Sequence, residues 1–409
     1  MEKVIFIIII VILVGNYLLE GILQLLNMRY SKNPIPAAIA DIYTEDRHAI
    51  QRRYQQANIK MSVLNNTICL LLNLLLIGWG FAWLNNHLLT VTQHPLWHSL
   101  LFFAVYIIFT FIIELPLNIY GTFCIEAKFG FNTTTPALFA KDSVVSLLLN
   151  LLMQMVLISA VVLGWMWQPD WMWLIGWAFV AVIIIFLNLF YPQLIVPLFN
   201  KQTPLPEGEL RDAIEQFAEK VGFKVDNIYV QDSSKRSTKA NAYFTGFFNK
   251  KRIVLYDTLI KQLSTEEIVA VLAHEIGHEK HHHTLRALLS SLLQFLLMFV
   301  LLGLILHYDV FAEAIGCEPT FVAKFVVFML LYNPIVAVIK IIGNIFSRKH
   351  EYQADSFAKN NGLADALISG LKKLMANHLG NPLPHPLTVW ITYSHPTLCQ
   401  RIEALKNNG

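Results

Sequence analysis

Long apolar runs alternate with polar stretches along this chain, and seven of the runs are long enough to cross a membrane. A membrane-spanning helix needs about 20 mostly apolar residues to cover roughly 30 Å of hydrocarbon. The seven windows lie at residues 4–26, 62–84, 99–120, 143–165, 171–192, 287–307 and 321–346. The hydrophobic pattern therefore predicts an α-helical polytopic membrane protein with seven transmembrane helices.

A polar segment separates the fifth window from the sixth and has other periodicities. Apolar residues between Leu210 and Val221 recur at helical spacing. A β-rich run follows at 227–230, and NAYFTGFF and RIVLYD, on either side of the turn-like NKK at 249–251, predict a hairpin. We therefore expect a small soluble α+β insertion at this point.

The composition agrees with a membrane protein rather than a soluble one. Of 409 residues, 55% are hydrophobic and only 14% are charged, whereas charged residues make up about 25% of a typical soluble domain. The mean hydropathy is +0.50. No small-residue cleavage site follows the first window, so we expect this window to be a helix and not a cleaved secretory signal.

The distribution of Lys and Arg predicts the orientation of the helices. Segments 27–61 and 121–142 contain basic residues, whereas 85–98, 166–170 and 308–320 contain none. Since basic loops stay on the cytoplasmic side, we expect the N-terminus outside and both the insertion and the C-terminal tail inside. Loop orientation also accounts for the net charge of +3, so no nucleic-acid partner is expected.

These features divide the chain into four predicted parts. The parts are residues 1–192 with transmembrane helices one to five and their loops, 193–286 with the cytoplasmic insertion, 287–346 with transmembrane helices six and seven, and 347–409 as a C-terminal cytoplasmic segment.

The predicted spans contain more polar residues than lipid-facing helices tolerate. A single Asn in such a helix is usually explained by a hydrogen bond to a neighbouring helix. Glu114 and Lys340, however, are costly to leave in hydrocarbon. Taken together, the polar residues indicate a hydrated interior between the helices.

The stretch VLAHEIGHEKHHH at 271–283 carries the strongest chemical signal of the chain. On a helix, His274 and His278 lie one turn apart and point the same way, as two ligands of a tetrahedral zinc ion do. Glu275 lies beside them, where it can take a proton from metal-bound water. This is the HExxH arrangement of zinc hydrolases.

The sequence also predicts the helix on which these residues lie. Ser264 and Glu267 have the spacing of a capping box, so the helix should run from 265 to about 283. We interpret the remaining histidines of the stretch as solvated or interfacial helix residues rather than ligands. They are His281, His282 and His283.

Zinc in a hydrolase needs three protein ligands and an open position for water. The stretch SRKHEYQADSFA at 347–358 begins just after the seventh window. Because windows six and seven form an antiparallel pair, this stretch returns to the level of HEIGH, and Glu351 can serve as the third ligand. Asp355, one turn further along, can accept a hydrogen bond from a ligating imidazole and fix its orientation.

Two other classes of protein share some of these features. A carrier or channel could use seven spans and a wet interior, but it has no use for HExxH with a returning Glu. A di-iron oxidase needs ExxH on two facing helices, a pattern that Glu45 with His48 and Glu275 with His278 satisfy. Metal content separates the three classes: one zinc, no metal or two irons.

Several motifs together resemble the type I CAAX prenyl proteases, integral-membrane zinc metalloproteases of the gluzincin type. The motifs are HEIGH at 274, SRKHEYQADSFA at 347, KANAYFTGFFNKKRIVLYDTL at 239, YSHPTLCQRI at 393, EAKFGFNTTT at 126 and YPQLIVPLFNKQTPLPEGEL at 191. The resemblance covers nearly the whole chain. One departure is Cys399–Gln400, where an acidic residue commonly precedes the Arg that corresponds to Arg401.

The resemblance implies a barrel of seven helices around a large water-filled chamber, closed on one side by the insertion, with one Zn²⁺ facing inward. It implies that Asn241 binds substrate, on a strand with which an extended peptide pairs. It also assigns His395, together with Arg401, as catalytic residues that stabilise the developing oxyanion.

The resemblance further implies a zinc endopeptidase that removes the C-terminal tripeptide from prenylated CaaX proteins or peptides. Zinc on His274, His278 and Glu351 would activate water, with Glu275 as the base and then the acid. The alternative is a quality-control metalloprotease for unprenylated or misfolded membrane chains. The compact chain favours the bacterial inner membrane, or the endoplasmic reticulum membrane if the source is eukaryotic, with the active-site segments on the cytoplasmic side.

Overall fold

The computed structural model describes residues 1–223, 227–245 and 252–407. Within these residues seven helical segments are long and apolar enough to cross a membrane, and each overlaps one of the predicted windows. The segments are Glu2–Tyr30, Glu45–Val91, Pro95–Glu126, Pro136–Trp167, Pro169–Phe199, His283–Leu306 and Phe321–Asn360. The prediction of seven spans is confirmed.

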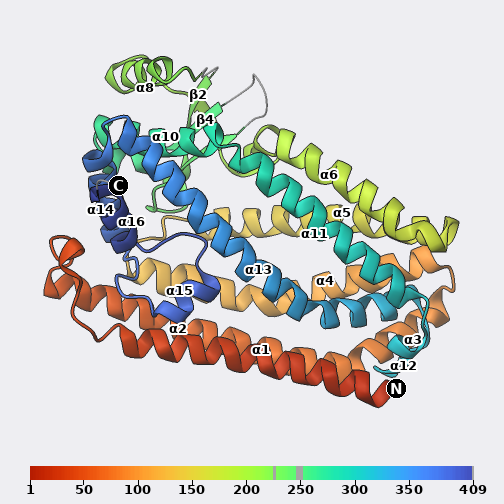
Figure 1. Ribbon diagram of the computed structural model, residues 1–409. Helices are drawn as coiled ribbons and strands as arrows, with labels where there is room; N and C mark the ends of the chain where they lie inside the picture. The colour runs from red at the N-terminus through yellow and green to blue at the C-terminus, as the bar shows by residue number, and fades with distance from the viewer. Residues whose placement is uncertain (224–226, 246–251, 408–409) are drawn as a thin grey trace.

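The helices of these spans form a barrel, and the insertion covers the end that lies away from the N-terminus (Figure 1). The helices of the barrel are α1 (Glu2–Tyr30), α2 (Glu45–Leu75), α3 (Phe81–Val91), α4 (Pro95–Tyr120), α5 (Pro136–Trp167), α6 (Met172–Leu194), α11 (His283–Leu306) and α13 (Phe321–Asn360), with the short α7 (Val196–Phe199) and α12 (Val310–Glu313) beside them.

The insertion contains a four-stranded mixed sheet of order β1-β2-β4-β3. Its strands are β1 (Gln202–Pro204), β2 (Asn227–Gln231), β3 (Ala242–Thr245) and β4 (Arg252–Tyr256). The β2–β4 pair is parallel, and the β1–β2 and β3–β4 pairs are antiparallel. The predicted hairpin is therefore present as the β3–β4 pair, although its NKK turn at 249–251 lies outside the described residues.

Further helices surround the sheet or connect this end of the molecule to the barrel. They are α8 (Glu209–Lys220), α9 (Asp257–Gln262), α10 (Thr265–Lys280), α14 (Ala364–Asn377), α15 (Pro386–Thr392) and α16 (Leu398–Lys406). Among them, α15 packs against α13 and α1. One hydrophobic core joins α8, α10, α14 and α16 with the central strands, and includes Ile214, Ile253, Ile268, Ile276 and Ile402. A second core, with Ile9, Phe102, Met172, Phe299 and Phe328, joins the membrane helices.

Two ion pairs fasten the insertion to the first half of the barrel. The guanidinium of Arg236 donates from Nε and Nη2 to both carboxylate oxygens of Asp142 on α5, at 2.7 and 2.8 Å. The Lys239 ammonium lies 2.7 Å from Glu126 at the end of the third span. Because Lys239 comes three residues before β3, these pairs fix the position of that strand over the barrel.

Polar residues of the spans fall into the two groups that their chemistry suggests. Some bind across helix pairs: Asn66 on α2 donates to Glu20 on α1, and the hydroxyls of Tyr17 and Thr67 lie 3.1 Å apart. The hydrogen bonds satisfy these groups without water. Glu114 on α4, by contrast, is an exposed side chain in mid-span.

The last span continues without a break into the segment that carries Glu351. Helix α13 has 40 residues, which corresponds to about 60 Å at 1.5 Å per residue, roughly twice the thickness of the hydrocarbon. Its second half packs against α10, and the two helices approach most closely at Gly277. A Cβ atom on Gly277 would lie 2.9 Å from the Cα of Ala354 and 3.0 Å from the Cβ of Phe357.

This close approach predicts the effect of adding a single methyl group. Gly277→Ala should lower the free energy of unfolding by about 1–3 kcal/mol, because the backbone of α13 has to move away. Gly343→Ala on α13 is the matched control, since a Cβ there meets no atom within 4 Å, and it should be neutral or stabilising by about 0.5–1 kcal/mol. Thermal unfolding of the detergent-solubilised proteins measures both, and equal stability of the two variants would contradict the packing.

Candidate active site

Helix α10 presents His274 and His278, and its start is fixed as the sequence predicts. The backbone N–H of Ser264 donates to Glu267 at 2.8 Å, and the N–H of Glu267 donates to the Ser264 hydroxyl at 3.3 Å. Lys373 and Ser369 on α14 also bind the Glu267 carboxylate. The capping box is confirmed, and the cap is anchored to a second helix.

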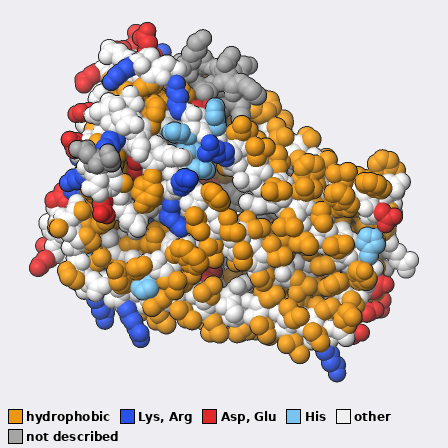
Figure 2. Space-filling model, in the orientation of Figure 1, with side chains coloured by type: hydrophobic (Ala, Val, Ile, Leu, Met, Phe, Trp, Pro, Cys, Tyr) orange, Lys and Arg blue, Asp and Glu red, His pale blue; other side chains and the backbone are white. Residues whose placement is uncertain are grey.

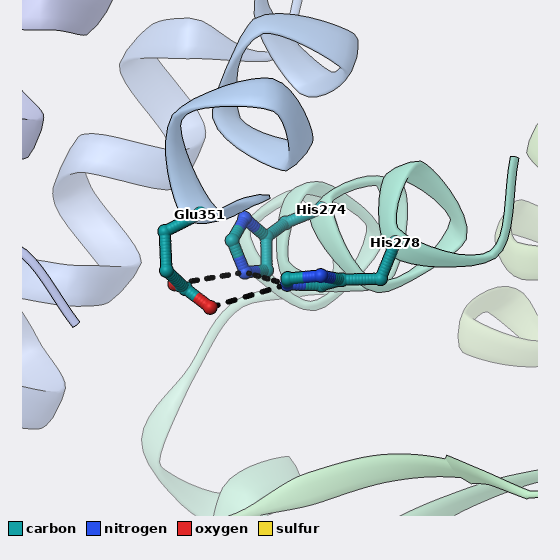
Figure 3. Close-up of side chains that lie close together, drawn as sticks. All are labelled: His274, His278 and Glu351. Atoms are coloured by element: carbon teal, nitrogen blue, oxygen red, sulfur yellow. Dashed lines mark hydrogen bonds and ion pairs between the residues drawn. The ribbon is translucent and has the colours of Figure 1, made fainter. Parts of the chain in front are cut away.

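Three potential ligand atoms converge between α10 and α13 (Figure 3). The Nε2 atoms of His274 and His278 lie 3.2 Å apart. The carboxylate oxygens of Glu351 lie 3.3 Å from Nε2 of His278 and 3.5 Å from Nε2 of His274. Two ligands of a tetrahedral zinc ion, each about 2.0 Å from the metal, lie about 3.3 Å apart, so the three side chains fit this geometry.

The donor set also has a group that a cation would satisfy. Oε2 of Glu351 is buried and lies 3.5 Å from Nη1 of Arg401, but it has no hydrogen-bond partner within the described residues. A buried carboxylate oxygen without a hydrogen bond is costly. His274, His278 and Glu351 form the one cluster of metal-binding side chains found in the described part of the chain. The other ExxH pair, Glu45 with His48, is not part of it.

The orientation of His274 is fixed by a buried ion pair behind it. Its Nδ1 lies 2.8 Å from Oδ1 of Asp355, and Arg401 on α16 binds Asp355 through Nη2 at 2.6 Å and Nε at 2.9 Å. The imidazole therefore donates from Nδ1, which leaves Nε2 free for a metal. Burial alone would lower the pKa of Arg401, but the hydrogen bonding to Asp355 and the negative charges around the guanidinium together outweigh burial and raise this pKa.

The second imidazole is oriented by a residue that the sequence analysis did not identify. His283 is buried, its Nδ1 lies 2.9 Å from Nδ1 of His278, and its Nε2 lies 2.9 Å from Oε1 of Gln353. With Nε2 of His278 facing a metal, one assignment of protons satisfies the chain: His278 donates to His283, and His283 donates to Gln353.

The prediction that His283 is a solvated or interfacial residue is therefore wrong, whereas His281 and His282 are exposed as expected. The predicted helix ends at Lys280 rather than near residue 283. His282 has a φ of 56° in the left-handed region, and a new helix, α11, starts at His283. This turn directs the side chain of His283 back toward α10.

His395 and Arg401, the two residues that the family resemblance assigns to catalysis, lie beside the cluster of His274, His278 and Glu351. Nε2 of His395 is 3.4 Å from Oε1 of Glu351, and its Nδ1 is 2.9 Å from the Ser394 hydroxyl. The His395 side chain is 63% exposed, so it remains accessible to a bound molecule. Arg401, in contrast, is buried, with Nη1 3.5 Å from Oε2 of Glu351.

Glu275 and Asn241, the two remaining predicted site residues, differ in their exposure to solvent. Burial raises the pKa of the Glu275 carboxyl, although neighbouring His274 and His278 act in the opposite direction. Asn241 is exposed just before β3, and its side chain accepts a hydrogen bond from the N–H of Ala242 at 2.9 Å. Since β3 is an outer strand of the sheet, its free edge is available to an extended peptide.

Comparisons with known proteins agree with this site. Residues 24–201 match the family model described as CAAX prenyl protease N-terminal, five membrane helices, and residues 204–408 match Peptidase family M48. A CAAX prenyl protease 1 homolog of Oryza sativa subsp. japonica is 33% identical over 96% of this chain and 95% of its own length. The CAAX prenyl protease 1 of Saccharomyces cerevisiae is 34% identical over 92% of this chain and 89% of its own length.

A solved structure is similar along the whole length of the chain. The crystal structure of S. mikatae Ste24p aligns with a TM-score of 0.93 at 32% sequence identity, and the match covers 98% of this chain and 99% of that one. The family models for both halves of the chain and the structural match along its whole length therefore indicate the same family. The chain belongs to peptidase family M48, among the CAAX prenyl proteases, and is a metalloendopeptidase of the membrane.

Proposed function

We propose that this protein is a zinc-dependent endopeptidase that removes the C-terminal tripeptide from proteins or peptides ending in a prenylated Cys and three further residues. The observation that carries the proposal is the convergence of His274, His278 and Glu351 at 3.2–3.5 Å. The names of the relatives support this substrate class, and none of them favours a general quality-control protease.

Zinc is the metal that suits this donor set best. Two imidazoles and one carboxylate, with room for water at a fourth position, are typical of catalytic zinc sites. Held by His274, His278 and Glu351, a zinc ion would supply the nucleophile by lowering the pKa of a water molecule toward neutrality.

Glu275 moves the protons in the proposed reaction. Its carboxylate takes a proton from the attacking water and returns it to the leaving amine when the peptide bond breaks. Burial raises the pKa of Glu275, and a base with a raised pKa accepts this proton more readily.

His395 and Arg401 have different proposed roles. His395 is accessible and held through Nδ1 by Ser394, so its Nε2–H can donate to the oxygen that becomes negative as water attacks. Such a donor contributes about 3–4 kcal/mol in other hydrolases. Arg401 is buried behind Asp355, and its contacts favour a positioning role, in which it holds Asp355 against His274.

The substrate peptide is proposed to add a strand to the free edge of β3, beside Asn241. Main-chain hydrogen bonds then hold the peptide with little dependence on its side chains. The loop charges support a cytoplasmic position for the insertion and the active-site segments. The protein is proposed to reside in the bacterial inner membrane, or in the endoplasmic reticulum membrane of a eukaryotic cell.

Glu275→Gln should leave metal binding intact and abolish cleavage, because the amide cannot accept the proton of the attacking water. Cleavage of a fluorogenic peptide and the metal content of the same sample measure the two properties. A chelator should inactivate the wild-type protein, and added zinc should restore it. Turnover at the wild-type rate in the variant would refute the role of Glu275.

His283 allows a test of the hydrogen bond that orients His278. His283→Phe keeps an aromatic ring at this position but removes Nδ1, the acceptor for His278. Metal affinity should therefore fall by about 10–100-fold. In His283→Asn the amide oxygen can take the place of Nδ1, and affinity should stay within a few-fold of wild type. Competition with a chelating dye measures both variants, and equal losses would show that the acceptor is unimportant.

The substrate class is tested by mass spectrometry of the products from two peptides that differ only in farnesylation of the Cys. The proposal predicts release of the intact tripeptide, with a higher kcat/KM for the farnesylated peptide. Equal cleavage of both peptides, or cuts at several other bonds, would favour the general protease.

A further inference from the structure

A cleft of about 680 Å³ lies between α11 and α13, the sixth and seventh spans. It adjoins the catalytic cluster at His350 and Gln353, but neither the three metal-binding side chains nor Glu275 line it. Its walls include Arg286, Ser290 and Gln294 from α11 and Ile342, Phe346 and Lys349 from α13. Nothing in the proposed hydrolysis uses these residues.

The charge of the cleft lining changes in the same direction along both helices. On α11, which runs away from the insertion, Arg286 comes first and Gln294 follows about 12 Å deeper at 1.5 Å per residue. On α13, which runs toward the insertion, Ile342 lies about 10 Å deeper than Lys349. The cleft therefore has a cationic rim at the insertion end and an uncharged interior, which is apolar along α13 and polar along α11.

The interior is wide where α13 has a glycine. Gly343 lines the cleft, and a Cβ atom built on it meets nothing within 4 Å. A glycine within a helix costs about 1 kcal/mol relative to alanine, and close packing of another element does not require this one. The space beside Gly343 is available to a ligand.

The surroundings of the cleft are suited to lipid. Leu289 and Leu293 on α11 are 57% and 67% exposed, and Phe346 on α13 is 58% exposed. Figure 2 shows Lys, Arg and His side chains gathered above the broad hydrophobic belt, where α10, α11 and α13 meet in Figure 1. A ligand in the cleft would thus have its charged end level with this basic group and its remainder among hydrophobic side chains.

We propose that this cleft binds an anionic phospholipid, with the phosphate between Arg286 and Lys349 and an acyl chain along Ile342 and Phe346. Basic pockets between transmembrane helices are a known kind of binding site for anionic headgroups. The cationic rim favours a phospholipid over an uncharged isoprenoid chain. The apolar wall along α13 favours a phospholipid over free phosphate.

The test uses the full-length protein in mild detergent, with phosphatidylglycerol, phosphatidylcholine or inorganic phosphate added separately. Native mass spectrometry measures bound lipid, and the thermal midpoint measures stabilisation. We expect the wild-type protein to retain phosphatidylglycerol at least tenfold better than phosphatidylcholine and to gain several degrees in Tm from it. Inorganic phosphate should give no gain.

Three variants test where the lipid binds. Arg286→Gln with Lys349→Gln should remove the preference for phosphatidylglycerol. Gly343→Leu should weaken its binding by at least tenfold, because the new side chain fills the cleft while both charges remain. Arg53→Gln with Lys60→Gln on α2 removes the same number of exposed charges elsewhere and should retain the wild-type preference. Metal content confirms that each variant is folded.

Four results would overturn the proposal. The first is equal retention of the two lipids by the wild-type protein, and the second is unchanged phosphatidylglycerol binding in Gly343→Leu or in the double glutamine variant. The third is an equal gain in Tm from inorganic phosphate, which would indicate a small-anion site. The fourth is a Gly343→Leu protein that binds phosphatidylglycerol normally but has a raised KM for a farnesylated peptide only, which would assign the cleft to the substrate's isoprenoid. The first three results do not depend on which peptides the enzyme cleaves, so they separate a failure of this proposal from a failure of the proposed function.

Discussion

The close approach of α10 to α13 is the constraint on which the active site depends. The two helices come together at Gly277, where the backbone of α13 occupies the space of a side chain. Gly277 lies between His274 and His278 on α10, and Ala354 lies between Glu351 and Asp355 on α13. The contact therefore sets the distance between the imidazoles and the carboxylate directly. The membrane span contributes by holding α13 as one continuous helix, so that its second half reaches the insertion.

Electrostatics explains why this arrangement calls for a divalent cation. Glu275, Glu351 and Asp355 bring three negative charges into a small and largely buried volume, and Arg401 contributes one positive charge. With neutral histidines the net charge of these four side chains is −2, which a Zn²⁺ ion balances. Repulsion among the carboxylates and their desolvation otherwise oppose this packing, so metal binding and the stability of this end of the molecule are coupled.

The sequence allows much of this structure to be predicted because the signals are periodic and local. Apolar windows predict the seven spans, and the capping box with HExxH predicts α10 and its two imidazoles. Glu351 follows from the antiparallel pairing of the last two spans. Strand β1 is not predicted, because three residues ending in Pro204 at the edge of a sheet show no alternation.

The role of His283 could not be predicted for a different reason. Its position depends on the left-handed backbone of His282, which ends one helix and starts another within three residues. A run of three histidines carries no signal for such a turn. The partner Gln353 becomes visible only when distant segments are brought together, whereas Asp355 is recognisable from its spacing of four residues from Glu351.

The central claim is that two imidazoles and one carboxylate, separated in sequence by two membrane spans, bind a single zinc ion. Metal analysis combined with X-ray absorption at the zinc edge, on wild type and Glu351→Ala, tests it most directly. The account predicts one zinc per chain, with two imidazole nitrogens and oxygen ligands at about 2.0–2.1 Å, and loss of one oxygen ligand and of most of the zinc in the variant. Sulfur ligands, two metal ions per chain, or an unchanged spectrum and zinc content in Glu351→Ala would contradict it.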